Sequence, residues 1–130
     1  MAIANGTVMI NRKNLSATVL LVGNATVNVA GNSTTSDLAV DDEVITGGYI
    51  TQVWFGSPSG NGAYWSVKRG ANLVSIFDST AYLDFAGNGN PIKLDPTATL
   101  VANLVGSTAG TLIVEIQKQG TMPTAYAQNN

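Results

Sequence analysis

Short segments of alternating apolar and polar residues fill the chain between residues 49 and 119, and they are rich in β-branched and aromatic side chains. The segments are closed by Gly, Pro, Asn or Asp, which favour turns. The clearest segments are residues 49–55, 63–68, 72–77 and 111–117. Because alternation places successive side chains on opposite faces of a strand, this spacing predicts an all-β sandwich or barrel.

The remaining segments add strands and no helix. Residues 7–12, 15–22 and 25–30 carry strand patterns near the start of the chain, and residues 82–85 and 100–105 carry them later. No stretch keeps a helical period with capping residues. We therefore expect an antiparallel, jelly-roll-like β-sandwich of about nine short strands.

The same pattern predicts how some strands are arranged. Alternation places Trp54 on the same face of its strand as Ile50. Residues 100–105 and 111–117 flank a loop rich in Gly, Ser and Thr, which predicts a closing β-hairpin. Residues 91–94 form a short segment with Pro91 at its start and Pro96 after its end. Such a segment fits the edge of a sheet.

Length and hydropathy bound the organisation of the chain. A chain of 130 residues is most simply one domain with a substantial core. We expect one β-sandwich domain over residues 1–119, with a short N-terminal arm, and a polar tail over residues 120–130. The longest aliphatic run, residues 19–22, is too short to span a bilayer. The first residues do not form a secretory signal pattern.

Composition narrows the chemistry. Charged residues make up 11% of the chain and the net charge is −2, so we expect no general attraction to nucleic acid or to an anionic membrane. The sequence contains neither Cys nor His. It therefore lacks the thiolate nucleophile, the commonest general base and the commonest transition-metal ligand. We predict a protein that is not an enzyme, with no catalytic residue, cofactor or metal site.

Acidic and hydroxyl residues are the candidates for chemistry. The cluster at residues 41–43 carries ligands for a hard cation but lacks the spacing of an EF-hand loop, so a solvated turn is favoured. Asp78 and Asp84 have the side chains of a glycosidase acid/base pair, but Asp is also a preferred turn residue, and turn roles are expected. Ser66 and Lys68 have the side chains of a Ser–Lys catalytic pair. Alternation alone places them on one strand face, so their closeness carries little weight.

Glycine-rich loops and aromatic side chains remain as binding candidates. Residues 87–89 lack the third glycine and the strand–helix context of a phosphate loop, so they predict a turn. The loop at residues 56–62 is long enough to bind a ligand or a neighbouring chain. Core packing is expected for Trp65 and Phe77. The aromatic residues that offer a platform for a sugar or a base are Tyr49, Trp54, Tyr64 and Trp65.

Three segments carry a resemblance to a known group of proteins: residues 64–70 (YWSVKRG), 84–89 (DFAGNG) and 110–118 (GTLIVEIQK). Over residues 49–119 the chain resembles small virion structural proteins of tailed bacteriophages, in particular cyanophage-like ones. Within that group it is most similar to capsid decoration (cement) proteins. The likeness lies in the texture of strands and turns together with a few shared words. It maps no functional residue of the family onto this chain.

The resemblance implies a virion structural protein on the capsid surface that stabilises the head lattice through inter-subunit contacts and is made in the host cytoplasm. The implied partners are the major capsid protein or other virion proteins, and a second copy of the chain. A trimer would suit the local three-fold positions of a capsid lattice. The alternatives are a tail-, neck- or fibre-associated β-module, or a carbohydrate-binding jelly roll. The jelly roll would use an exposed aromatic residue from the set Trp54, Tyr64, Trp65 and Tyr82.

Overall fold

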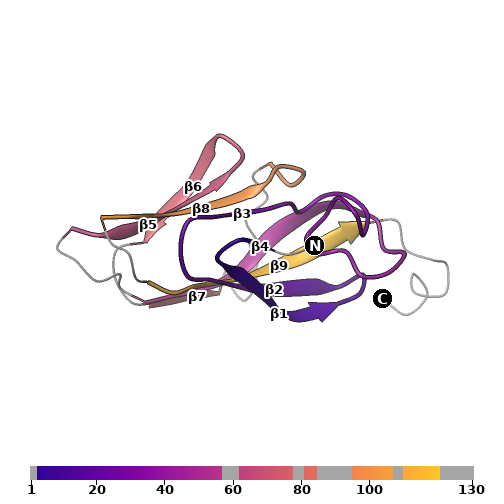
Figure 1. Cartoon of the computed structure of the whole chain (residues 1–130), viewed down its shortest axis with the longest axis horizontal. Coiled ribbons are helices and arrows are strands. Elements are labelled where there is room, and N and C mark those ends of the chain that lie inside the picture. The colour runs from indigo at the N-terminus through magenta and orange to yellow at the C-terminus, as the bar shows by residue number, and fades with distance from the viewer. Residues whose placement is uncertain (1–2, 57–61, 78–80, 85–94, 107–109, 121–130) are drawn as a thin grey trace.

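The computed structural model describes residues 3–56, 62–77, 81–84, 95–106 and 110–120 (Figure 1). Within these residues there are nine β-strands and no helix. The strands are β1 (Gly6–Arg12), β2 (Ser16–Leu21), β3 (Ala25–Val27), β4 (Ile45–Phe55), β5 (Tyr64–Arg69), β6 (Asn72–Phe77), β7 (Ala81–Asp84), β8 (Leu100–Val105) and β9 (Leu112–Gly120). The predicted all-β class is confirmed.

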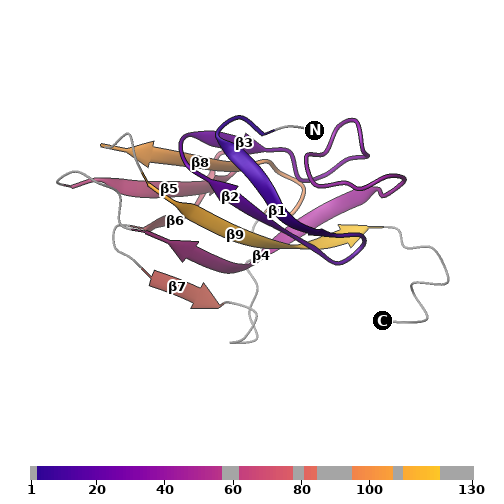
Figure 2. The same ribbon diagram turned by 60° about the horizontal axis from the view of Figure 1, so that its bottom comes forward.

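The strands form two antiparallel sheets that pack face to face (Figure 2). The five-stranded sheet has the order β1-β2-β9-β4-β7, and the four-stranded sheet has the order β3-β8-β5-β6. Buried apolar residues from both sheets form one cluster between them. The molecule is therefore a β-sandwich, as predicted.

Strand pairing follows a nested pattern. β2 pairs with β9, β3 with β8, β4 with β7, and β5 with β6. The chain therefore runs like one long hairpin whose two arms are folded over into two sheets. β1 lies outside this nest and extends the five-stranded sheet beyond β2.

The core follows from alternation along each strand. In β9, Leu112, Val114 and Ile116 face inward and are fully buried. Trp65 is fully buried and Phe77 is 4% exposed, so the prediction that these two residues pack in the core is confirmed. Burial of each such side chain stabilises the fold by about 1.5–3 kcal/mol. The same alternation carries Arg69 and Lys118 to the inner faces of β5 and β9.

The predicted closing hairpin is wrong. β8 pairs with β3 and β5 in the four-stranded sheet, whereas β9 pairs with β2 and β4 in the five-stranded sheet. Each strand is thus more extensively paired than a two-stranded hairpin would allow. The two strands therefore lie in different layers of the sandwich.

The predicted face of Trp54 is also wrong relative to Ile50. The register between β4 and β9 shifts between Ile50 and Gln52, which leaves Thr51 as the extra residue of a β-bulge. Ile50 is fully buried on the inner face, while Trp54 is half-buried on the outer face. One inserted residue reverses the alternation for everything that follows it.

Several predictions concern residues outside the described ranges. They include Asp78, the turn at residues 87–89, the edge segment at residues 91–94 and most of the loop at residues 56–62. The tail predicted after residue 120 also lies outside them, and β9 ends at Gly120. These stay predictions.

Candidate functional site

An apolar row crosses the outer face of the five-stranded sheet. Strand register places Leu20 of β2 beside Ile113 of β9, Ile113 beside Trp54 of β4, and Trp54 beside Tyr82 of β7. Tyr82 is 47% exposed. The row therefore offers apolar and aromatic contact area across four neighbouring strands.

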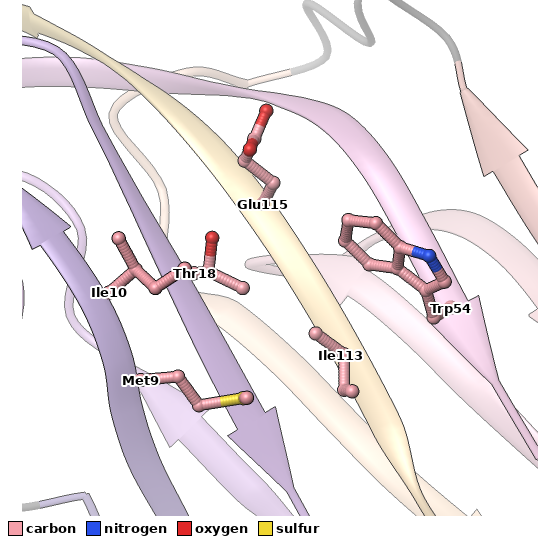
Figure 3. Close-up of a pocket in the computed structure, with 6 residues that line it drawn as sticks. All are labelled: Met9, Ile10, Thr18, Trp54, Ile113 and Glu115. Carbon is pink, nitrogen blue, oxygen red and sulfur yellow. The ribbon is translucent and has the colours of Figure 1, made fainter.

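A pocket lies on this face next to the row, with a volume of about 310 Å³. Figure 3 shows the side chains that line it, which come from β1, β2, β4 and β9: Met9, Ile10, Thr18, Trp54, Ile113 and Glu115. We call it the outer pocket. Its lining is apolar apart from Thr18 and Glu115, so a partner would meet a largely hydrophobic surface that contains one carboxylate.

A bulge in β1 shapes one wall of the outer pocket. The register with β2 shifts between Val8 and Ile10, so Met9 is the extra residue. Met9 is 52% exposed and Ile10 is 48% exposed. Because a bulge re-aims side chains, two consecutive large apolar residues are exposed together. Regular alternation would have buried one of them.

Glu115 gives the outer pocket its polar group. The Thr51 hydroxyl, at the bulge of β4, donates a hydrogen bond of 2.7 Å to Glu115 Oε1. Thr51 is itself only 4% exposed, so the carboxylate is held by a fixed neighbour. A fixed carboxylate in apolar surroundings favours a partner that brings a hydrogen-bond donor or a positive charge.

Trp54 and Tyr82 form a stacked aromatic pair on the same face. Their ring centroids are 4.9 Å apart and their planes are inclined by 21°. Partial desolvation raises the pKa of Tyr82 above its ordinary value of 10.0. The Asp84 carboxylate, which accepts a hydrogen bond from the phenol, raises this pKa further. Tyr82 therefore remains a neutral phenol at physiological pH.

The other aromatic candidates differ in burial and in the sheet to which they belong. Trp65 is fully buried, which removes it as a binding platform. Tyr64 lies on β5 in the opposite sheet and is half-buried, and Tyr49 is half-buried on β4. Neither of these tyrosines lines the outer pocket. The pair of Trp54 and Tyr82 is thus the part of the predicted aromatic set that the fold brings together.

The acidic cluster at residues 41–43 divides into two environments. Asp42 has an 83% exposed side chain and pairs with Lys13, whose hydrogen bond and charge lower the pKa of Asp42 below 3.8. Asp41 is exposed and adopts a positive φ of 50°. The predicted solvated turn fits these two residues but is wrong for Glu43, which is 4% exposed. Glu43 turns inward because the Lys118 ammonium lies there, 2.8 Å from its Oε1.

The fully buried Arg69 is the second inward-facing cation. Its guanidinium donates to the backbone carbonyl oxygens of Gly48 at 2.7 Å, Pro96 at 2.8 Å and Ala98 at 2.9 Å. Burial lowers the pKa of Arg69, and the charge of Asp95 raises it. The sequence prediction missed Arg69 and missed the inward position of Glu43, which it placed in a solvated turn. Strict alternation in β5 was the available signal for Arg69, and no local pattern marks the burial of Glu43.

Among the residues that the structure describes, the remaining candidates do not assemble into a catalytic constellation. Asp84 lies beside Tyr82 on the edge strand β7, and Ser66 and Lys68 are half-buried on one face of β5. In the described ranges, His, Cys, Asp and Glu form no group of three or more that is suited to a metal ion. The described part of the chain also contains no helix that is long and apolar enough to cross a membrane.

The fold and the outer pocket together define a β-sandwich protein with an exposed apolar face on its five-stranded sheet. Comparison with protein-family models, with curated proteins and with solved structures finds no match for this chain.

Proposed function

We propose that this protein is a phage virion structural protein of the capsid decoration (cement) type. It docks on the head lattice through the outer face of its five-stranded sheet. The observation that carries the proposal is the exposed apolar surface around the outer pocket, where Met9, Ile10 and Tyr82 are each about half exposed. Large apolar surfaces that remain exposed on a folded domain mark sites of interaction.

The residue types on this face suit a protein partner. Met and the aromatic residues are enriched in the cores of protein interfaces, and Trp and Tyr are common among the residues that dominate binding energy. Glu115 would accept a hydrogen bond from a donor on the partner. Modest affinity at each copy is sufficient on a repeating lattice if the subunits also contact one another, because linked sites reinforce binding.

The nested strand pairing also supports the proposal. Pairing of β2 with β9, β3 with β8, β4 with β7 and β5 with β6 is what a long hairpin gives when it folds into a jelly roll. Jelly rolls occur in viral capsid domains and in lectins. Because one fold serves many functions, the topology supports the proposal without selecting between these two classes.

The first test is co-sedimentation of the purified protein with mature capsids that lack it and, in parallel, with unexpanded procapsids. We expect saturable binding to mature capsids and weaker binding to procapsids, because expansion creates the lattice geometry that a decoration protein recognises. Absence of binding to either particle would overturn the decoration role. It would shift the proposal to the tail-, neck- or fibre-associated module.

A matched pair of variants tests whether the outer pocket is the docking surface. Met9→Asp changes a residue that is 52% exposed at the pocket, and Ile76→Asp changes one that is 50% exposed in the other sheet. We expect Met9→Asp to weaken capsid binding by at least about tenfold, since a buried unpaired charge at an interface costs several kcal/mol. Ile76→Asp should bind like the unmodified protein. Equal binding by both variants would exclude the outer pocket.

The stacked pair of Trp54 and Tyr82 favours one second candidate, a carbohydrate-binding jelly roll. Aromatic faces beside a carboxylate, here Asp84, are suited to the apolar face and the hydroxyl groups of a sugar. Titration of tryptophan fluorescence with a panel of glycans separates the two functions. A saturable change that Tyr82→Ala abolishes would favour the lectin, and a flat titration would favour the capsid protein.

A further inference from the structure

Lys118, Glu43 and Asn11 meet at the end of the sandwich where residues 13–15 join β1 to β2. Lys118 Nζ lies 2.8 Å from Glu43 Oε1 and 2.6 Å from Asn11 Oδ1. The side chains of Lys118 and Glu43 are each 1% exposed. The outer pocket and the proposed function use none of these three residues.

The amide of Asn11 lies close to the amine. The carbonyl carbon Cγ is one C=O bond, about 1.2 Å, from Oδ1, so Nζ is within about 4 Å of that carbon. Asn11 pairs with Ala17 of β2, which is fully buried, and this register places Asn11 on the inner side of β1. Its Nδ2 donates to the Leu38 carbonyl oxygen at 3.0 Å. The amide is therefore held in a fixed orientation next to Nζ.

Glu43 is equally fixed. Its Oε2 accepts a hydrogen bond from the Asn14 backbone N–H at 2.5 Å, and its Oε1 accepts one from the Val40 N–H at 3.0 Å. Oε1 also faces the Lys118 ammonium. A buried carboxylate is thus positioned to accept a proton from the amine, with its orientation set by backbone groups.

From this geometry we propose that Lys118 and Asn11 form an intramolecular isopeptide bond, with Glu43 as the catalytic proton carrier. The product is a secondary amide between Lys118 Nζ and Asn11 Cγ, and ammonia is released. The bond would join β1 to β9, and so connect the first strand of the sandwich covalently to the last.

The reaction balances without any co-reactant. Glu43 takes a proton from the Lys118 ammonium, and the freed lone pair of Nζ attacks Cγ while the C=O π electrons move onto Oδ1. Glu43 then gives that proton to Nδ2, the carbonyl re-forms, and the Cγ–Nδ2 bond breaks to release ammonia. Nζ passes one further proton to Glu43, which returns it to the ammonia. The net change converts one ammonium and one carboxamide into a secondary amide and an ammonium ion.

The surroundings of Lys118 favour formation of the isopeptide bond over a simple ion pair with Glu43. Reacting groups held close to about 3–3.5 Å gain much of the barrier reduction that enzymes obtain from proximity. A positioned acid–base group adds roughly a hundredfold or more. Asn11 is itself exposed overall, which gives the released ammonia a path to solvent.

The first measurement is the intact mass of the purified full chain under denaturing conditions. We expect the mass to be lower than that of the sequence by one ammonia. After digestion, trypsin should not cleave after Lys118, and a branched peptide should contain both Asn11 and Lys118. The branched peptide distinguishes the cross-link from loss of ammonia by backbone cyclisation at an asparagine. A chain with its full mass and normal cleavage after Lys118 would overturn the proposal.

Two neighbouring carboxylates provide the matched variants. Glu43→Gln keeps the shape of the side chain but cannot carry the proton, and we expect the rate of ammonia loss to fall by roughly a hundredfold or more. Asp42→Asn removes the exposed carboxylate next to it and should leave the cross-link complete. If Glu43→Gln folds, as shown by circular dichroism, and still cross-links at the normal rate, Glu43 is not the proton carrier.

A third variant keeps the test decisive if Glu43→Gln fails to fold. Asn11→Asp places a carboxyl group at the attacked carbon, so the leaving group becomes water. The cross-linked forms of the unmodified chain and of Asn11→Asp are then the same molecule with the same mass. A folded Asn11→Asp chain that retains its water, together with an unmodified chain that retains its ammonia, would show a buried ion pair and nothing more.

Discussion

At the scale of single residues, strand alternation places two positively charged side chains in the described core, Arg69 and Lys118. Different groups stabilise the two charges. Lys118 follows Leu112, Val114 and Ile116 on the inner face of β9 and meets the carboxylate of Glu43. Arg69 follows Trp65 and Val67 on β5, and its hydrogen bonds in the described residues go to backbone carbonyl oxygens. The planar guanidinium suits this role because its five donors spread in a fixed fork.

Replacement of Arg69 tests how much this fork stabilises the sandwich. Arg69→Met removes this donor from the carbonyl oxygens of Gly48, Pro96 and Ala98, of which Pro96 keeps the Gly48 N–H. Each buried acceptor left without a donor costs about 1–3 kcal/mol, so we expect the free energy of unfolding to fall by about 2 kcal/mol or more. Urea denaturation measures it. Lys68→Met, on the opposite face of the same strand, is the control, and a similar loss in both variants would contradict this role of Arg69.

At the scale of elements, the sequence predicted the strands well and their faces less well. Alternation located β5, β6 and β9 within a few residues, because each keeps one face in the core. It failed at Thr51, because a bulge inserts one residue without a distinctive sequence signal. The predicted segment at residues 49–55 also starts too late, because β4 begins at Ile45 and both Gly47 and Gly48 lie inside it.

Gly48 lies within β4 for a steric reason that can be tested. A β-carbon at Gly48 would lie 2.6 Å from Ile116 Cγ2 and 2.8 Å from Val29 Cγ1, both of which are in the fully buried core. Gly48→Ala should therefore lower the free energy of unfolding by about 1–3 kcal/mol through overpacking. A β-carbon at Gly56, at the end of the same strand, would meet no atom within 4 Å. Thermal unfolding of Gly48→Ala and Gly56→Ala side by side checks this, and equal melting temperatures would refute the steric reason.

At the scale of the whole molecule, the sites depend on pairings between distant parts of the chain. Trp54 and Tyr82 were named as aromatic candidates from sequence, but their stacking depends on the pairing of β4 with β7. The outer pocket needs β1, β2, β4 and β9 together, and no local pattern encodes that combination. The hairpin prediction failed for the same reason, because loop composition does not reveal that consecutive strands belong to different sheets.

The proposed bond between Asn11 and Lys118 would act on this long-range organisation. It closes a loop between residues that are 107 positions apart in the chain. By analogy with a disulfide, a cross-link over a loop of that length stabilises the folded state by roughly 4–5 kcal/mol through the entropy of the unfolded chain. Such a bond would hold together a sandwich whose first and last strands both belong to the five-stranded sheet.

Removal of residues 121–130 separates folding from assembly. The truncated chain ends where β9 ends, at Gly120, so it retains every strand pairing described and also Lys118. We therefore expect its melting temperature to match that of the full chain. If the polar tail reaches adjacent subunits on the lattice and becomes ordered there, co-sedimentation with mature capsids should weaken in the truncated chain alone. Unchanged capsid binding would assign the docking energy to the folded domain, where the outer pocket lies, and would remove the tail from the assembly.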